Sequence, residues 1–255
     1  LQLDGKSILI DPMLGRDTSP IAPFKTKRFS ENTLAIIDQL PQLDAILLTH
    51  DHYDHLDLAS IKKLKPKVDT WFVALGVARH LEAWGISSNQ ITEFDWWDNL
   101  EFKGISITFT PSRHFSGRGL TDRAKSRWGG WVFKTSTHSI YWTGDSGESN
   151  VFKTVGEKLG PFDWAFVECG QYNERWHAIH MFPEEAVQAA LDSKSNIMIP
   201  VHWAGFPLSL HTWKDPIERC MAEAKIKAQK TCTPQIGQIV IMKEETTSEW
   251  WKALE

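Results

Sequence analysis

Residues 47–57 read LLTHDHYDHLD, a stretch that places three histidines and three aspartates directly behind an apolar run. The run itself, residues 43–49 (LDAILLT), has the length of a strand and no polar face, which is typical of a buried central strand. Burying unpaired ionisable side chains costs several kcal/mol each, and coordination to a divalent cation offsets that cost. The stretch therefore predicts a metal site at the end of a core strand.

Four side chains of this stretch form the metal-binding pattern H-x-H-x-D-H: His50, His52, Asp54 and His55. Alternate residues of an extended or tightly turned segment point the same way. The first two histidines can therefore bind one ion, while the following aspartate and histidine turn towards a second. By the same alternation Asp51 and Tyr53 point away and have no metal role. Asp57 is expected to cap the next helix.

Two ions with roughly ten ligand positions need more donors than one loop offers. Three further candidates each follow an apolar run within a few residues: His114, Asp145 and His202. The carboxyl ends of strands converge on a crevice in α/β architectures, so these side chains can meet the loop there. Each alone is more typical of a capped strand end. Together with the H-x-H-x-D-H loop they predict the remaining ligands.

The rest of the chain predicts one domain over residues 1–255, without a linker or a short-period repeat. Asp4-Gly5 predicts an N-terminal hairpin whose first strand is cut short, and residues 13–33 are expected to form a loop. Further strands are expected at 105–112, 131–145, 163–169, 196–203 and 238–243. Helices are expected at 32–40, 57–65, 77–84, 183–193 and 215–230.

Composition excludes some classes of function. The 255 residues are 42% hydrophobic and carry a formal net charge of -4, which gives no support to wholesale nucleic-acid binding. Three cysteines without paired spacing give no disulfide framework, and no apolar run approaches the ~18–20 residues of a membrane span. We therefore expect a cytoplasmic protein, although the chain starts at Leu1 without a methionine. Leu254-Glu255 is consistent with a cloning scar.

The histidine loop, followed by a later His, a Gly-Asp and a last His behind strands, resembles the metallo-β-lactamase superfamily. The resemblance implies an α/β fold, an αββα sandwich with two mixed β-sheets face to face, helices outside and a dinuclear metal site at one edge. It implies three sets of ligands: His50, His52 and His114 on the first ion, Asp54, His55 and His202 on the second, and Asp145 bridging both. Such ligation suits zinc best and admits manganese or iron.

The resemblance is more specific to one branch of this superfamily. The segments LIDPML, TPSRHFSGR, GPFDWAFVECGQYNERW, HMFPEEAV and VHWAGFPLSLHTW resemble the N-acyl-phosphatidylethanolamine phospholipase D-like branch and its bacterial relatives, over residues 9–224. This implies that a metal-bridging hydroxide attacks a phosphodiester, with catalytic roles for Asp54 and His180. A helix cap is the structural alternative for His180. Asp11 is expected to orient a ligand histidine. Relative to the lipid-cleaving members of that branch, we expect an N-terminal extension and the start of a first strand to be missing here, and the segment between Arg175 and His180 to be shorter.

Residues 113–128, RHFSGRGLTDRAKSRW, carry five basic residues against one acid within a chain of net charge -4. Because arginine forks match phosphate oxygens and the segment begins at a ligand, it is expected to hold the substrate anion through Arg118 and Arg127. His211 is the remaining histidine expected to touch substrate. The alternative is a solvated loop whose basic residues pair with nearby acids.

These observations favour a dinuclear metal-dependent hydrolase, a phosphodiesterase acting on a small-molecule or lipid-like anionic substrate. Two alternatives stay open: a lactonase of the ascorbate-phosphate lactonase-like type, and a non-catalytic metal-binding protein. The branch contains dimers, so a homodimer is a further expectation. Peripheral membrane contact is a further expectation if Trp96, Trp97, Trp128 or Trp131 lines an exposed groove.

Overall fold

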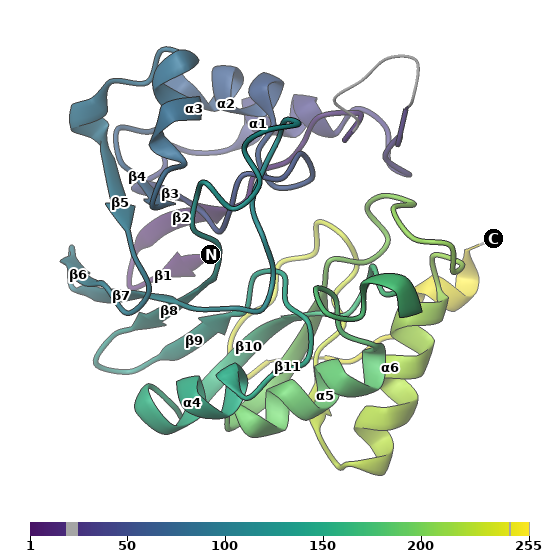
Figure 1. Ribbon diagram of the computed structural model, residues 1–255. Helices are drawn as coiled ribbons and strands as arrows, with labels where there is room; N and C mark the ends of the chain where they lie inside the picture. The colour runs from purple at the N-terminus through teal and green to yellow at the C-terminus, as the bar shows by residue number, and fades with distance from the viewer. Residues whose placement is uncertain (19–24, 245, 255) are drawn as a thin grey trace.

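Two β-sheets organise the chain in a computed structural model that describes residues 1–18, 25–244 and 246–254 (Figure 1). The first sheet has the strand order β1-β2-β3-β4-β5 and the second the order β12-β11-β10-β9-β8-β7-β6. Helices α1, α2 and α3 lie outside the first sheet, and α4, α5 and α6 lie outside the second (Figure 1). The predicted α/β fold, an αββα sandwich, is confirmed.

The first sheet consists of β1 (Gln2–Leu3), β2 (Lys6–Ile10), β3 (Ala45–Leu48), β4 (Trp71–Ala74) and β5 (Ile91–Phe94). The second consists of β6 (Asn99–Phe102), β7 (Ile105–Thr110), β8 (Gly130–Lys134), β9 (Ser139–Trp142), β10 (Phe162–Glu168), β11 (Ser195–Val201) and β12 (Lys230–Thr231). The α-helices are α1 (Ile36–Gln39), α2 (Leu58–Leu64), α3 (Ala78–Ala83), α4 (Val151–Lys158), α5 (Pro183–Asp192) and α6 (Asp215–Ile226). Short 3-10 turns include η5 (Trp250–Ala253) near the C-terminal end.

Strand direction brings several carboxyl ends to one edge of the sandwich. In the first sheet β3 is parallel to β2 and β4. In the second sheet β9, β10 and β11 are mutually parallel, and β7 runs the same way because β8 is antiparallel to both β7 and β9. Loops that leave these strands can therefore place polar side chains close together, as in other α/β folds.

The core lies between the two sheets. All four residues of β3 and of β4 are buried, as expected of strands covered on both faces. They pack in one cluster with residues of β7 and β8, including Phe109, Phe133 and Trp131. Since Trp131 is fully buried, it cannot line an exposed aromatic groove, and this corrects one residue of the expected membrane-facing set. No helix in the described ranges is long and apolar enough to span a membrane.

Several local predictions are confirmed. Asp4 and Gly5 both have positive φ in the turn of the β1-β2 hairpin. The Asp57 carboxylate accepts a hydrogen bond from the Ser60 backbone N–H (2.8 Å) and caps α2. The helix predicted at 183–193 is α5, with Pro183 in its first turn. The predicted loop over 13–33 is only partly described, since residues 19–24 lie outside the described ranges, as does Glu255.

Two predicted strands are wrong. Residues 131–145 form the hairpin β8-β9, because the Thr135 N–H donates to the His138 carbonyl (2.9 Å) and turns the chain. Residues 238–243 form no strand in the described part of the chain. There Ile239 and Ile241 are exposed, while Val240 packs against a small cluster on the second sheet. The short edge strand β12 pairs with β11 instead.

Candidate metal centre

The predicted ligands meet at the edge where the strand ends converge. The histidine loop follows β3 of the first sheet, and the other three donors follow β7, β9 and β11 of the second. Their ligand atoms form two groups, in each of which all atoms lie within 4.8 Å of one another: His50, His52 and His114, and Asp54, His55, Asp145 and His202. The grouping places both sheets around a common centre.

In the first group three ring nitrogens face one point. Nε2 of His50 lies 2.9 Å from Nδ1 of His52, and Nε2 of His114 lies 3.1 Å from the same atom. The outer nitrogens of His50 and His114 are occupied, since Nδ1 of His50 lies 2.9 Å from Oγ1 of Thr49 and Nδ1 of His114 donates to the Ile179 carbonyl (2.9 Å). Nε2 of His52 is buried and has no hydrogen-bond partner among the described residues. Burial holds the pKa of His50 and of His114 well below the usual range. Neutral imidazoles with bare inward nitrogens are the form that binds metals.

The second group combines carboxylates with two histidines. Nε2 of His202 lies 3.1 Å from Oδ2 of Asp54, and Nε2 of His55 lies 3.1 Å from Oδ2 of Asp145. Burial would raise the pKa of Asp54, but His55 and His202 outweigh it and hold the pKa below its usual range. Burial would lower the pKa of His202, but Asp145 and Asp54 raise it to about 10. Nearby positive charge stabilises these buried carboxylates. Protonated histidines supply it here, and a bound cation would supply it as well.

Asp145 belongs to both groups by position. Its Oδ2 lies 4.0 Å from Nε2 of His50 and 3.8 Å from Nε2 of His114. The same oxygen lies 3.1 Å from Nε2 of His55 and 3.6 Å from Nε2 of His202. One carboxylate oxygen therefore stands between the two sets of donors. The donor chemistry fits two divalent cations held side by side.

Comparison with known proteins agrees with this geometry. The family model described as "Beta-lactamase superfamily domain" matches residues 6–203. The chain belongs to the metallo-β-lactamase superfamily. The resemblance predicted from the histidine loop and the later donors is therefore confirmed.

Relatives within the metallo-β-lactamase superfamily cover most of the chain. An uncharacterized protein of Mycobacterium tuberculosis (strain ATCC 25618 / H37Rv) is 38% identical over 94% of this chain, which spans 65% of that protein's length. The N-acyl-phosphatidylethanolamine-hydrolyzing phospholipase D 1 of Caenorhabditis elegans is 33% identical over 94% of this chain and 72% of its own. Igni18, a metallo hydrolase of the archaeon Ignicoccus hospitalis KIN4/I, shares the fold with a TM-score of 0.71 at 21% identity, over 93% of this chain and 91% of that one. A relative in Saccharolobus solfataricus, 30% identical over 67% of this chain and 66% of its own length, is named a metal-dependent hydrolase.

Asp11 lies where the sequence predicts it, against the superfamily's histidine loop. Its Oδ2 accepts from Nδ1 of His55 (2.8 Å) and from Oγ1 of Thr49 (2.6 Å). Because the Thr49 hydroxyl donates to Asp11, it accepts from Nδ1 of His50 (2.9 Å). Asp11 therefore sets the tautomer of one histidine in each group and turns both Nε2 atoms inward.

His180 lies beside the donors, and a buried glutamate holds it. The His180 ring is 5.0 Å from that of His114 and stacks on that of His202 at 5.7 Å. Nδ1 of His180 lies 3.3 Å from Oε1 of Glu168, whose side chain is 1% exposed at the end of β10. Glu168 is not among the site residues predicted from the sequence. The available signal was an acid at the end of the apolar run DWAFVEC, as for Asp145 behind its own strand.

Arg118 does not face the metal donors. Its Nη1 donates to the backbone carbonyls of Asp51 (2.8 Å) and Leu56 (2.8 Å), and its guanidinium lies 3.8 Å above the Tyr53 ring. The guanidinium is occupied by the loop that carries the ligands. We therefore replace the predicted substrate contact of Arg118 with a role in holding this loop.

Arg127 is also engaged elsewhere, as the alternative of a solvated loop paired with acids anticipated. Nε of Arg127 donates to Oδ1 of Asp95 (2.7 Å), and its guanidinium lies over the Trp96 ring. The predicted substrate contact of Arg127 is corrected for the same reason. His211 stacks on Tyr172 at 4.3 Å in a neighbouring pocket, so its contact with substrate stays a prediction.

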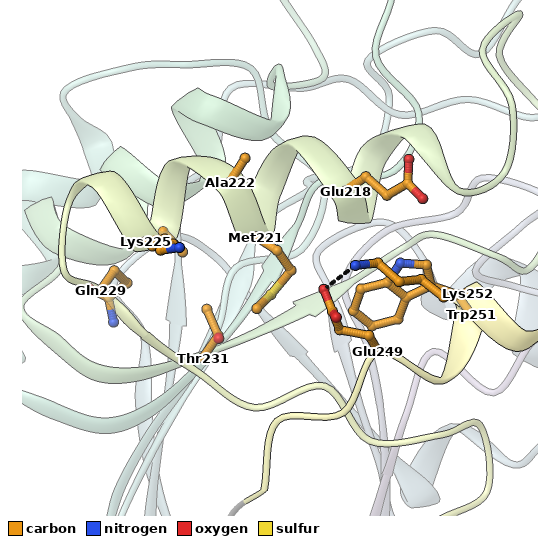
Figure 2. A pocket seen from close by; sticks show the side chains of 10 residues that line it. Glu218, Met221, Ala222, Lys225, Gln229, Thr231, Glu249, Trp251 and Lys252 are labelled. Atoms are coloured by element: carbon orange, nitrogen blue, oxygen red, sulfur yellow. Dashed lines mark ion pairs between the residues drawn. The ribbon is translucent and has the colours of Figure 1, made fainter.

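Two cavities of about 180 Å³ each open onto the donors. One is lined by six site residues besides other side chains: Asp11, Asp54, His55, Asp145, Glu168 and His202. The other adds Arg28 and Phe206 next to Asp54 and His202. A larger cavity, of about 710 Å³, lies between α6 and η5 (Figure 2), where Met221 faces Trp251 and Lys252 pairs with Glu249 at 2.8 Å. None of the predicted site residues lines this cavity, so cavity volume does not identify the candidate active site.

Proposed function

We propose that this protein is a phosphodiesterase that uses two divalent metal ions to hydrolyse a small-molecule or lipid-like anionic substrate. The observation that carries the proposal is the place of Asp145, whose Oδ2 lies within 4.0 Å of donor nitrogens from both groups. A carboxylate shared in this way holds two ions close together, which suits attack on a phosphodiester. The phospholipase D relative in Caenorhabditis elegans supports this class of substrate.

The donors would divide between the ions as follows: His50, His52 and His114 for the first, Asp54, His55 and His202 for the second, and Asp145 for both. Imidazole and carboxylate donors suit zinc best, and they also admit manganese or iron. Bound there, the two ions would supply Lewis acidity towards the phosphoryl oxygen and a nucleophilic water at neutral pH.

Two side chains would act on the reacting groups. Asp54 lines both cavities, where its carboxylate can orient the attacking water by accepting a hydrogen bond. His180 uses Nδ1 for Glu168, and its Nε2 makes no hydrogen bond to any described residue. Nε2 can therefore donate to the leaving oxygen of the substrate, either a hydrogen bond or a proton.

The test compares metal content and turnover in the purified protein. We expect two metal ions per chain and hydrolysis of bis(p-nitrophenyl) phosphate above the rate on a panel of lactones. Asp145→Asn and His50→Ala should each lower turnover at least about 100-fold, because each removes a metal donor. His138→Ala is the matched control, since His138 lies in the β8-β9 turn away from the donors.

The same assay decides between the alternatives. Two bound ions with turnover of lactones alone would replace the phosphodiesterase with a lactonase. Two bound ions without turnover of either substrate would favour a metal-binding protein without catalysis. Full activity in Asp145→Asn and His50→Ala would contradict a dinuclear mechanism altogether.

A further inference from the structure

An anionic substrate at the donor site calls for a positively charged side chain in addition to metal ions. The basic segment 113–128 does not place such a side chain there. Four carboxylates surround the donors and repel a phosphate: Asp11, Asp54, Asp145 and Glu168. Among the described residues that line the two cavities there is no lysine, and Arg28 is the single arginine. Any direct side-chain neutralisation of the substrate, apart from metal ions and histidines, therefore falls to Arg28.

The backbone fixes Arg28 beside the ligand His202. The N–H of Phe29 donates to the carbonyl of Gly205 (3.0 Å), three residues beyond this ligand. The Arg28 side chain then donates through Nε to the Gly15 carbonyl (3.3 Å) and through Nη2 to the Met13 carbonyl. These bonds hold the guanidinium plane against the wall of the cavity.

One nitrogen of the guanidinium, Nη1, is not engaged by these hydrogen bonds. Nη1 of Arg28 makes no hydrogen bond to the described residues and lies next to Gly205, where an added Cβ would be 3.8 Å away. No carboxylate of the described residues lies within ion-pair distance of it. The Phe206 ring lies 4.2 Å from the guanidinium carbon on the same cavity. Burial lowers the pKa of Arg28 and the nearby charge of Asp57 raises it. Because Nη1 has no acceptor among the described residues, it can donate a hydrogen bond to an anion in the cavity.

We propose that Arg28 binds the anionic group of the substrate beside Asp54 and His202 and thereby selects phosphate-type anions over neutral esters. The inference rests on the proposed function for the reaction, but it makes a separate claim about ligand binding. A guanidinium forms a stronger hydrogen bond with an anionic phosphate oxygen than with the carbonyl oxygen of a neutral ester. The cavity's volume of about 180 Å³ leaves room for a phosphate group next to the donors.

The test is a calorimetric titration of the metal-loaded protein with inorganic phosphate. We expect Arg28→Met to weaken phosphate binding about 10- to 100-fold, as for loss of a hydrogen bond to a charged group. Arg28→Lys should retain part of the affinity. In parallel, the KM for bis(p-nitrophenyl) phosphate should rise in Arg28→Met while that for p-nitrophenyl acetate stays within about twofold.

Two control variants separate charge from packing. Thr33→Ala removes the hydrogen bond from Oγ1 of Thr33 to the Leu14 carbonyl (2.7 Å), which anchors the same loop without a charge. Lys103→Met removes a cation that pairs with Asp44 on the surface. Both should bind phosphate like the wild type. Equal losses in Thr33→Ala and Arg28→Met would mean that the loop, not the charge, sets the affinity, and would overturn the proposal.

The remaining outcomes are also decisive. Wild-type protein that binds no phosphate, or Arg28→Met that binds it normally, would overturn the role of Arg28 while leaving phosphodiester turnover intact as a separate result. Loss of phosphate binding in Arg28→Met without phosphodiester turnover in any variant would support the anion site and overturn the proposed function.

Discussion

At the scale of single residues, one carboxylate orients histidines of both donor groups. Asp11 accepts directly from His55 and, through the Thr49 hydroxyl, indirectly from His50. The residue has a φ of 43°, a left-handed conformation that is uncommon outside glycine. The backbone turns there directly after β2, which brings the carboxylate under the histidine loop. Such strain at a functional position is expected when the surrounding contacts hold it.

We predict that Asp11→Asn weakens binding of both metal ions about 10- to 100-fold. The amide can donate where the carboxylate only accepts, so it permits the wrong tautomer of His50 and His55. The measurement is a competitive zinc titration against a chromogenic chelator. Asp44→Asn, on the surface, is the control. Loss of a single ion, or none, would show that Asp11 does not serve both groups.

The clustering of the seven predicted donors could be predicted from sequence, because the histidine loop and the three later donors each follow an apolar run. Glu168 lies behind such a run as well, but a single acid there carries no pattern of its own. Arg28 and Arg118 could not be assigned from sequence. Chain spacing put Arg118 next to ligand His114, whereas its contacts are carbonyls of the other sheet's loop. Contacts between segments far apart in the chain decide such roles.

At the scale of elements, the segment after β7 locks the histidine loop. Arg118 holds the carbonyls of Asp51 and Leu56. The Asp51 carboxylate, which points away from the donors as predicted, accepts from the Gly117 N–H (2.7 Å) and the Ser126 hydroxyl (3.0 Å). Burial would raise the pKa of Asp51, but His80 and these donors hold it at about 2. Hydrogen bonds donated by the segment after β7 therefore hold both the backbone and the Asp51 side chain of the histidine loop.

We predict that Arg118→Met weakens metal binding about tenfold and leaves the KM for a phosphodiester unchanged once the protein is saturated with metal. The guanidinium supports the loop that carries four donors, and two charge-assisted hydrogen bonds are lost. Lys125→Met, in the same segment with an exposed side chain, is the matched control. A raised KM with normal metal affinity would restore Arg118 to the substrate site.

Elements with a clear sequence signal were predicted, whereas three short strands without one were not. The Asp57 cap with its apolar spacing identified α2, and Pro183 identified α5. The four-residue strands β4, β5 and β6 are too short for a period to be read. Residues 238–243 (QIVIMK) contain a short apolar run typical of a strand, but they pair with no neighbouring strand in the described ranges.

At the scale of the whole molecule, the donor site joins the two sheets. The loop after β3 belongs to the first sheet, while His114, Asp145 and His202 follow strands of the second. The sheets are otherwise held by the apolar core between them. The fold class could be predicted because the ligand order along the chain resembles one superfamily. The cavity that contains Arg28 depends on the relative placement of distant loops, so the sequence carries no local signal for it.

The proposed mechanism depends on Asp145 standing between two metal ions. Diffraction from crystals of the zinc-loaded protein, measured at the zinc absorption edge, locates these ions. We expect two anomalous peaks about 3.5–4 Å apart, one beside His50, His52 and His114 and the other beside Asp54, His55 and His202. A single peak, or two peaks that Asp145 does not contact, would contradict this mechanism.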